Sequence, residues 1–305
     1  MNIRIVVKKT DGSLITEEKL LSFTFRKNAY LPYTLLNARI LAVSENFENS
    51  AEIFMYIGEK LIHHGLLDSL KTVYSGGSRT VSIVSRGFTS LLCQNQIEPG
   101  LKTNITFNQL MDGYYTLPYV THEDNSAQSG YIYVSGKTTM WDGAVNLAYK
   151  FCGTYPYIRG TNCVRITPVG DPAVFSYGSN QILSQGFAMN GRRLISHFHM
   201  ADMGGEYGKY ELEDTEVEQY SIIRHRYSEM DMEFLYNPES ALEFSSKIAS
   251  RGKKAFFCSY SGYNGEDLSD VVSFGSINAE RIEGIEIKGT ARGIVTELSV
   301  YHDKF

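Results

Sequence analysis

The stretch IFMYIGEKLIHHG, residues 53–65, contains two short runs of apolar residues separated by a turn. Ile53, Met55 and Ile57 occupy every second position, which is the pattern of a strand that buries one face. The turn begins at Gly58, and the second run ends at Gly65. The stretch therefore predicts a β-hairpin of two short strands.

The same alternation occurs on both sides of this hairpin. Residues 3–7 and 23–25 carry apolar side chains at every second position, and Asp11-Gly12 supplies a turn between them. Residues 81–83 mark a further strand. Because short turns keep successive strands adjacent and antiparallel, we expect residues 1–98 to form a compact antiparallel β-barrel.

Helical patterns replace the alternation from residue 99 onward. Thr106 precedes Gln109 at the spacing of a capping box and predicts a short helix there. A clearer helix is predicted between a start signal at Thr139 and a stop at Gly153. The apolar residues that this second helix is expected to bury on one face are Trp141, Val145, Ala148 and Cys152.

A predicted hairpin follows the second helix. Its two short strands lie around residues 155–158 and 163–167, with a turn between them. Residues 99–170 are therefore predicted to be a small α/β insert that consists of two helices and a hairpin.

Strand patterns return in the last part of the chain, residues 171–305. One helix is expected at about 238–251, because Asn237 is a favoured N-cap and Pro238 fits the first helical position. The predicted fold class is mainly β, with two tube-like antiparallel β-barrel domains that flank the α/β insert. The similar contents of the two flanking units suggest a duplicated fold. The strands expected in the last unit are at residues 194–200, 220–227, 255–260, 282–288 and 294–301.

Composition excludes several classes of function. The formal net charge is −5, and no segment concentrates Lys and Arg beyond short pairs, so direct nucleic-acid binding is not expected. The four cysteines have neither zinc-site spacing nor a disulfide framework, which indicates free thiols in a protein folded in a reducing cytoplasm. No apolar run approaches the ~20 residues of a membrane span, so no membrane anchor is expected.

The best metal-site pattern in the sequence is His197-Phe198-His199. Strand alternation places both imidazoles on one face, and Asp202 lies nearby in the sequence. A third ligand at a characteristic spacing is missing. We therefore expect no metal, and the pair is interpreted as part of a solvent-exposed or interface strand.

Acidic residues are concentrated in one polar stretch, residues 211–218, which contains Glu211, Glu213, Asp214, Glu216 and Glu218. Glycoside hydrolysis needs two carboxylates on a rigid scaffold, one of them in an apolar pocket. The stretch is instead interpreted as a solvated, charged strand edge. Trp141 is expected in the core of its helix and not as a sugar-binding platform.

Nucleophilic chemistry has little support in the sequence. The GxSxG, HExxH, Walker and GxGxxG motifs are absent. Ser259 near Gly262 is interpreted as a strand end, and Cys93 and Cys152 have no neighbouring histidine. The expectation is a protein that is not an enzyme and has no cofactor.

The order of several short segments resembles the baseplate or tail hub family of contractile phage tails and R-type bacteriocins. The hairpin at 53–65 and the following strand resemble the first barrel of that family, and a tryptophan-led helix before a hairpin is similar to its insert. The family includes the T4-type central hub, the Mu-type tail hub, late control protein D and the hub portion of VgrG. The segments are VSIVSRG (81–87), TSLL (89–92), YIRG (157–160), RRLIS (192–196) and RHRY (224–227).

This resemblance implies a structural hub subunit without catalytic residues. It implies a homotrimeric ring that adapts a sixfold tail tube to a threefold central spike, because three subunits with two barrels each present six similar barrels. The implied partners are other copies of the chain, the tail tube protein, the central spike protein and the baseplate wedge proteins, with the tape-measure protein as a further candidate. The implied location is the virion or a tail-like particle. Since the sequence stops at Phe305, spike and hydrolase are expected to be separate chains.

Three elements are expected to line the ring or to contact the tube: the hairpin 56–64, the strand 193–199 and the strand 294–301. Two other functions stay open. The acidic stretch and the many aromatic residues are compatible with a tail-associated cell-wall hydrolase or carbohydrate-binding module, and His197 and His199 with a metal-dependent enzyme. The individual interface residues expected from the three elements are Tyr56, Lys60, His64, Arg193, His197, His199, Ile294, Leu298 and Tyr301.

Overall fold

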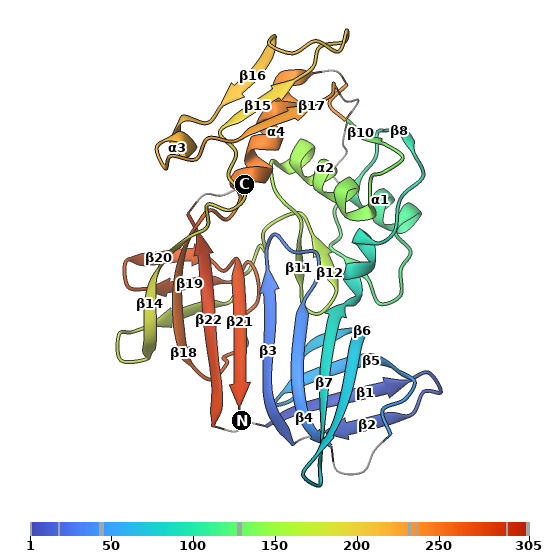
Figure 1. Cartoon of the computed structure of the whole chain (residues 1–305), viewed down its shortest axis with the longest axis vertical. Helices are drawn as coiled ribbons and strands as arrows, with labels where there is room; N and C mark the ends of the chain where they lie inside the picture. Colours follow the sequence, from blue (N-terminus) through green and yellow to red (C-terminus); the bar gives the residue numbers. More distant parts are fainter. Residues whose placement is uncertain are drawn as a thin grey trace.

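The computed structural model describes residues 2–17, 19–42, 46–126, 130–230, 233–235, 237–290 and 292–302. The fold is mainly β, as predicted, and is dominated by a large curled antiparallel sheet (Figure 1). Two smaller α/β regions lie beyond one end of this sheet. Phe305, where the sequence stops, is outside the described residues.

The large sheet contains eleven strands in the order β14-β18-β22-β21-β3-β4-β7-β6-β5-β1-β2. Seven of these strands come from the first part of the chain and four from the last part. The first seven are β1 (Ile3–Lys9), β2 (Leu14–Glu17), β3 (Leu20–Asn28), β4 (Leu35–Ala42), β5 (Ser50–Ile57), β6 (Lys60–Ser75) and β7 (Ser78–Gly87). The other four are β14 (Ile182–Met189), β18 (Lys254–Ser261), β21 (Gly284–Thr290) and β22 (Gly293–Tyr301).

The predicted hairpin at 53–65 is confirmed as β5 and β6, but its second strand does not end at Gly65. β6 continues to Ser75 and pairs with both β5 and β7. A Cβ atom on Gly65 would lie 2.2 Å from the carbonyl oxygen of Arg86. The glycine therefore allows the backbones of β6 and β7 to approach closely, and it does not stop the strand.

The first and last parts of the chain meet where β3 pairs with β21. Phe23 lies directly opposite Gly289 in this pair, and a Cβ atom on Gly289 would lie 1.9 Å from the Phe23 ring. The space that the glycine leaves is filled by the aromatic ring. The two β-rich units are thus hydrogen bonded into one sheet, and the division at residues 98 and 170 into separate domains stays a prediction.

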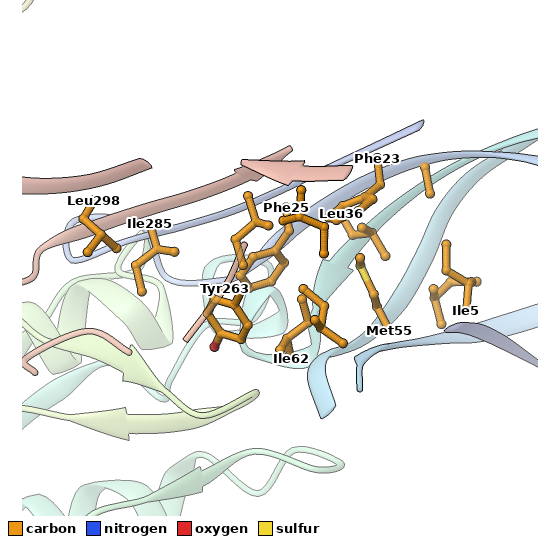
Figure 2. Packing of buried hydrophobic residues seen from close by; sticks show 14 of the residues in the cluster. Ile5, Phe23, Phe25, Leu36, Met55, Ile62, Tyr263, Ile285 and Leu298 are labelled. Carbon is orange, nitrogen blue, oxygen red and sulfur yellow. The ribbon is translucent and has the colours of Figure 1, made fainter. Parts of the chain in front are cut away.

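One hydrophobic core lies under the joined sheet. Its buried residues come from both parts of the chain, so each part completes the burial of the other. Figure 2 shows fourteen residues of this core and labels Ile5, Phe23, Phe25, Leu36, Met55, Ile62, Tyr263, Ile285 and Leu298.

The middle of the chain forms a second core around the two predicted helices. Both helices begin with the expected capping boxes, Thr106 with Gln109 and Thr139 with Asp142. Trp141 is buried, as predicted, but Cys152 is exposed in the last turn and does not belong to the apolar face. The elements are η1 (Phe88–Cys93), β8 (Gly100–Thr103), α1 (Phe107–Tyr114), β9 (Thr121–His122), β10 (Tyr131–Val134), α2 (Met140–Cys152), β11 (Tyr157–Arg159) and β12 (Cys163–Arg165).

A third region interrupts the last β-rich unit and has its own small core. The helix predicted at 238–251 is α4 (Pro238–Ser250), capped by Asn237 as expected. The strand predicted at 220–227 is present only at its end, because residues 215–224 form a short helix and turns. The other elements are β15 (His197–Met200), β16 (Tyr210–Glu213), α3 (Thr215–Glu218) and β17 (His225–Ser228), and a separate sheet contains β13 (Val174–Tyr177), β19 (Val271–Phe274) and β20 (Ile277–Arg281).

The Phe23–Gly289 contact leads to a stability prediction. We expect Gly289→Ala to lower the free energy of unfolding by ~1–3 kcal/mol, because its methyl group would overlap the Phe23 ring. The matched control is Gly113→Ala in α1, where nothing lies within 4 Å of the added carbon. That change should raise stability by up to ~1 kcal/mol through helix propensity. Urea unfolding of both variants measures the difference, and equal stabilities would contradict the close approach of β3 and β21.

His63 leads to a second prediction, on pH dependence. Its ring is fully buried between the hydroxyls of Thr34 and Ser85, each 2.8 Å away, and burial lowers its pKa from 6.5 to about 3. The unfolded chain therefore binds a proton that the folded chain excludes. The contribution of the buried, neutral His63 to the free energy of unfolding is complete above about pH 6.5, and it is lost as the pH falls toward 3.

Between pH 7 and pH 5 the wild-type protein should lose about 2 kcal/mol of stability from His63 alone. His63→Gln removes the titrating group. The unfolding free energy of this variant should therefore change by about 2 kcal/mol less between pH 7 and pH 5 than that of the wild-type protein. His302→Gln, at an exposed position, should keep the wild-type dependence. Urea unfolding at both pH values checks this, and parallel losses in all three proteins would refute it.

Candidate functional site

The hairpin β11–β12 is fixed to the large sheet by buried ion pairs. Lys27 on β3 contacts the Asp267 carboxylate and donates to the carbonyl of Gly160 at 2.6 Å. Asp267 also accepts from the Gly160 amide, at 2.7 Å. Arg159 forms a second pair with Asp270, at 2.8 Å. Burial lowers the pKa of Lys27, and the neighbouring Asp267 opposes that shift. Moving the insert would separate the partners and leave charged groups buried without a counter-charge, which is strongly destabilising. These pairs therefore hold the insert in one position on the sheet.

The two outer strands of the large sheet have unpaired edges within the described residues. β14 pairs only with β18 in this sheet, and β2 pairs only with β1. In Figure 1 the two strands lie on opposite sides of the molecule. Such edges present free backbone donors and acceptors to another strand.

The β14 edge also exposes large apolar side chains. Leu183 and Phe187 are 61% and 53% exposed, and Met189 lies on the same face as Phe187. Exposed apolar side chains on an unpaired edge strand favour association with another chain. The apolar residues of ILSQGFAM are visible in the sequence, but this strand was not among the predicted interface elements.

The predicted interface residues of the first hairpin have partners within the chain. His64 is buried, bonds to Glu52 at 2.9 Å and stacks on Phe54. Tyr56 is half-buried under the guanidinium of Arg4. Lys60 is exposed, although its ammonium donates to the carbonyl of Gly265.

The predicted residues of the last strand are buried. Ile294 and Leu298 belong to the large core, and Leu298 is 0% exposed. Tyr301 stacks on Tyr30 and accepts from the side chain of Asn28. Since β22 lies between β18 and β21, it has no free edge. These side chains pack within the chain, and an interface role for them stays a prediction.

Arg193 is exposed at a hollow of about 640 Å³ that also contains Arg192 and Arg251. The hollow lies where residues 190–193, the end of α4 and the last strand come together. Its lining includes three arginines, which make it basic. This arrangement does not test the predicted interface role of Arg193, which stays a prediction.

The structure separates Asp202 from the two histidines with which the sequence grouped it. Asp202 accepts the backbone amides of Gly204 and Glu206, and these bonds lower its pKa. His199 bonds to Glu211 at 2.9 Å, and His197 lies 3.2 Å from Glu218. His225, from β17, stacks on His197 and bonds to Nε2 of His199 at 2.9 Å, and the sequence patterns did not predict it as part of this cluster.

The acidic stretch contains no carboxyl group in an apolar pocket among the residues that the structure covers. Glu216 accepts from Lys254 and Lys253, and these bonds lower its pKa to about 2. A carboxylate held ionised in this way is unsuited to be the general acid of a glycosidase. Trp141, the candidate sugar platform, is buried and donates to the hydroxyl of Tyr155.

The surroundings of the candidate nucleophiles do not activate them. Burial raises the pKa of Cys258 to about 12 and that of Cys93 to about 11, so both thiols stay protonated at neutral pH. Ser259 is buried and shares a hydrogen bond with Ser184. Helices long and apolar enough to cross a membrane do not occur in the described part of the chain.

No family model matches the sequence, and no curated protein matches it either. Solved structures, in contrast, match over almost the whole chain. A tail protein from Neisseria meningitidis MC58 superposes with a TM-score of 0.70 at 13% identity, covering 99% of this chain and 97% of its own. The 43 kDa tail protein of prophage MuSo2 from Shewanella oneidensis gives 0.69 at 14% identity, covering 99% and 100%.

A more distant match is an E. coli component of the type VI secretion system that is structurally similar to the T4 bacteriophage tail proteins gp27 and gp5. It gives a TM-score of 0.54 at 8% identity and covers 99% of this chain and 76% of its own. The resemblance stated from the sequence is thus confirmed at the level of fold. This chain has the fold of phage tail proteins and of the related type VI secretion component.

Proposed function

We propose that the chain is a structural hub subunit at the baseplate of a contractile phage tail or tail-like bacteriocin. In this proposal it forms a homotrimeric ring that adapts the sixfold tail tube to the threefold central spike. Its partners would be other copies of itself, the tube, spike and wedge proteins, and the tape-measure protein. The shared fold supports a structural role in a tail, and the surroundings of the candidate nucleophiles and carboxylates favour no hydrolase.

The observation that carries the proposal is the pair of unpaired edges, β14 and β2, at the two ends of one eleven-stranded sheet. Because the edges differ, pairing the β14 edge of one copy with the β2 edge of the next is a head-to-tail contact. Repeated head-to-tail contacts close into a ring when the rotation between copies allows it. The exposed Leu183 and Phe187 would become buried in that contact.

The joined sheet also agrees with threefold symmetry. Each copy contributes two β-rich units that are fixed to each other by the β3–β21 pairing. Three copies would therefore place six such units around one axis. A sixfold tube could then make similar contacts with each unit, while a threefold spike matches the trimer itself.

A test follows from the edge strand. The purified chain should have three times its 34.3 kDa mass by light scattering coupled to size-exclusion chromatography. The double change Leu183→Lys/Phe187→Lys should give a folded monomer, because charges on the edge oppose pairing and burial. The control is Ile223→Lys, which changes an apolar residue that is even more exposed, at 71%, but lies outside the large sheet, and it should stay trimeric.

Circular dichroism of the three proteins should show the same β-rich spectrum. A wild-type monomer at micromolar concentration would contradict the ring. A trimer that persists in the double variant would place the interface away from β14.

A further inference from the structure

The three-stranded sheet β16-β15-β17 has one buried face and one polar face. Phe198 and Met200 on β15 point into the small core that α4 covers. His197, which precedes Phe198 on the strand, therefore points to the opposite face. The register places Glu213 directly across from His197 on one side and His225 on the other. Directly paired residues share a face of a sheet, so these three side chains lie together.

A second carboxylate reaches the same place from α3. Asp214 caps this short helix, and Glu218 at its end lies with one carboxylate oxygen 3.2 Å from Nε2 of His197. The potential ligand atoms of His197, Glu213 and Glu218 all lie within 4.8 Å of one another. The sequence separates these residues by up to 21 positions, and the sheet register and the α3 turn bring them together.

The hydrogen bonds of Ser196 fix the orientation of the His197 ring. The Ser196 hydroxyl donates to the carbonyl of Arg224 and accepts from the Arg224 amide. It also bonds to Nδ1 of His197, 2.8 Å away. The ring is thereby held with Nε2 facing the Glu218 carboxylate. Metal-binding histidines are oriented by this kind of bond to the second ring nitrogen.

The charges at this place are unbalanced. Neither Glu213 nor Glu218 forms an ion pair with Lys or Arg within the part of the chain that the structure describes. The neighbouring acidic residues differ, because Glu216 pairs with two lysines and Glu211 with His199. Two carboxylates and an imidazole nitrogen that converge on one point can be stabilised by a divalent cation between them.

We propose that His197, Glu213 and Glu218 bind a divalent transition-metal ion of the zinc class. One imidazole nitrogen and two carboxylate oxygens are ligands that Zn²⁺ accepts, with a fourth position for water. Metal–ligand bonds of ~2.0–2.2 Å in a tetrahedron bring ligand atoms to about 3.4 Å from one another. The exposed Glu213 side chain can close the remaining distance by rotating. His225, stacked on His197 at 4.3 Å, covers one side of the site.

The ion would connect α3 to β15 and β16, which contribute residues to the same small core. Among the contacts that join this region to the rest of the chain, Phe244 of α4 packs on Tyr149 of α2, and Glu216 of α3 pairs with Lys254 at the start of β18. A metal bound to the folded form alone stabilises that form by mass action. The site thus has a structural role in this region and needs no catalytic step.

The experiment is zinc binding by the full-length chain. We expect one equivalent of Zn²⁺ to remain after dialysis, as measured by elemental analysis, and competition with a chromophoric chelator gives the affinity. Glu213→Gln and Glu218→Gln should each weaken binding at least ~10-fold, because each removes a ligand. Ser196→Ala should weaken it ~10–100-fold by releasing the orientation of His197.

The matched control is Glu211→Gln. Glu211 lies on the same strand and the same face as Glu213 and bonds to His199, but it is outside the proposed ligand set. Its change should leave zinc affinity within ~2-fold, and circular dichroism should show that all variants are folded. Absence of stoichiometric zinc in the wild-type protein would overturn the proposal. An equal loss in Glu211→Gln and Glu213→Gln would also overturn it.

Discussion

Seven antiparallel residue pairs between β3 and β21 join the first part of the chain to the last. The pairing places four late strands beside seven early ones, so that a single sheet and a single core result. By itself, each part would bury less of its apolar face, because the residues that the other part now covers would be exposed. The buried Lys27–Asp267 pair then fixes the insert to the same junction.

The same junction determines which surfaces remain for other molecules. Strands in the middle of the sheet are satisfied on both sides, which leaves β14 and β2 as its two edges within the described residues. Their positions at opposite ends make a head-to-tail contact between copies the natural way to satisfy both. The assembly role proposed for the chain thus depends on an intramolecular pairing between residues about 260 positions apart.

Local signals in the sequence were sufficient to predict the positions of several elements. Capping boxes at Thr106 and Thr139 and the Asn237-Pro238 start located three helices, because these motifs act within one turn. Contacts between distant strands were not predictable in this way. The close approach of Gly65 to Arg86 turned an expected strand end into the middle of β6. Leu298, which was expected at an interface, is buried because its face of β22 packs on the large core, and an interface role for it stays a prediction.

The proposed metal site at His197 shows the same limit, since contacts between residues distant in the sequence could not be predicted from local patterns. The sequence placed His197 and His199 on one strand face correctly but offered no third ligand, and the nearby Asp202 is held in a turn. Glu213 and Glu218 became neighbours of His197 only through the register of β15 with β16 and the turn into α3. The β14 edge was missed because exposure and an unpaired edge are properties of the whole sheet.

Electron microscopy of the purified chain tests the central claim most directly. The account predicts class averages of a closed ring with threefold symmetry, in which six β-rich units surround a central opening. Single particles of monomer size, or open filaments built from the same head-to-tail contact, would contradict it.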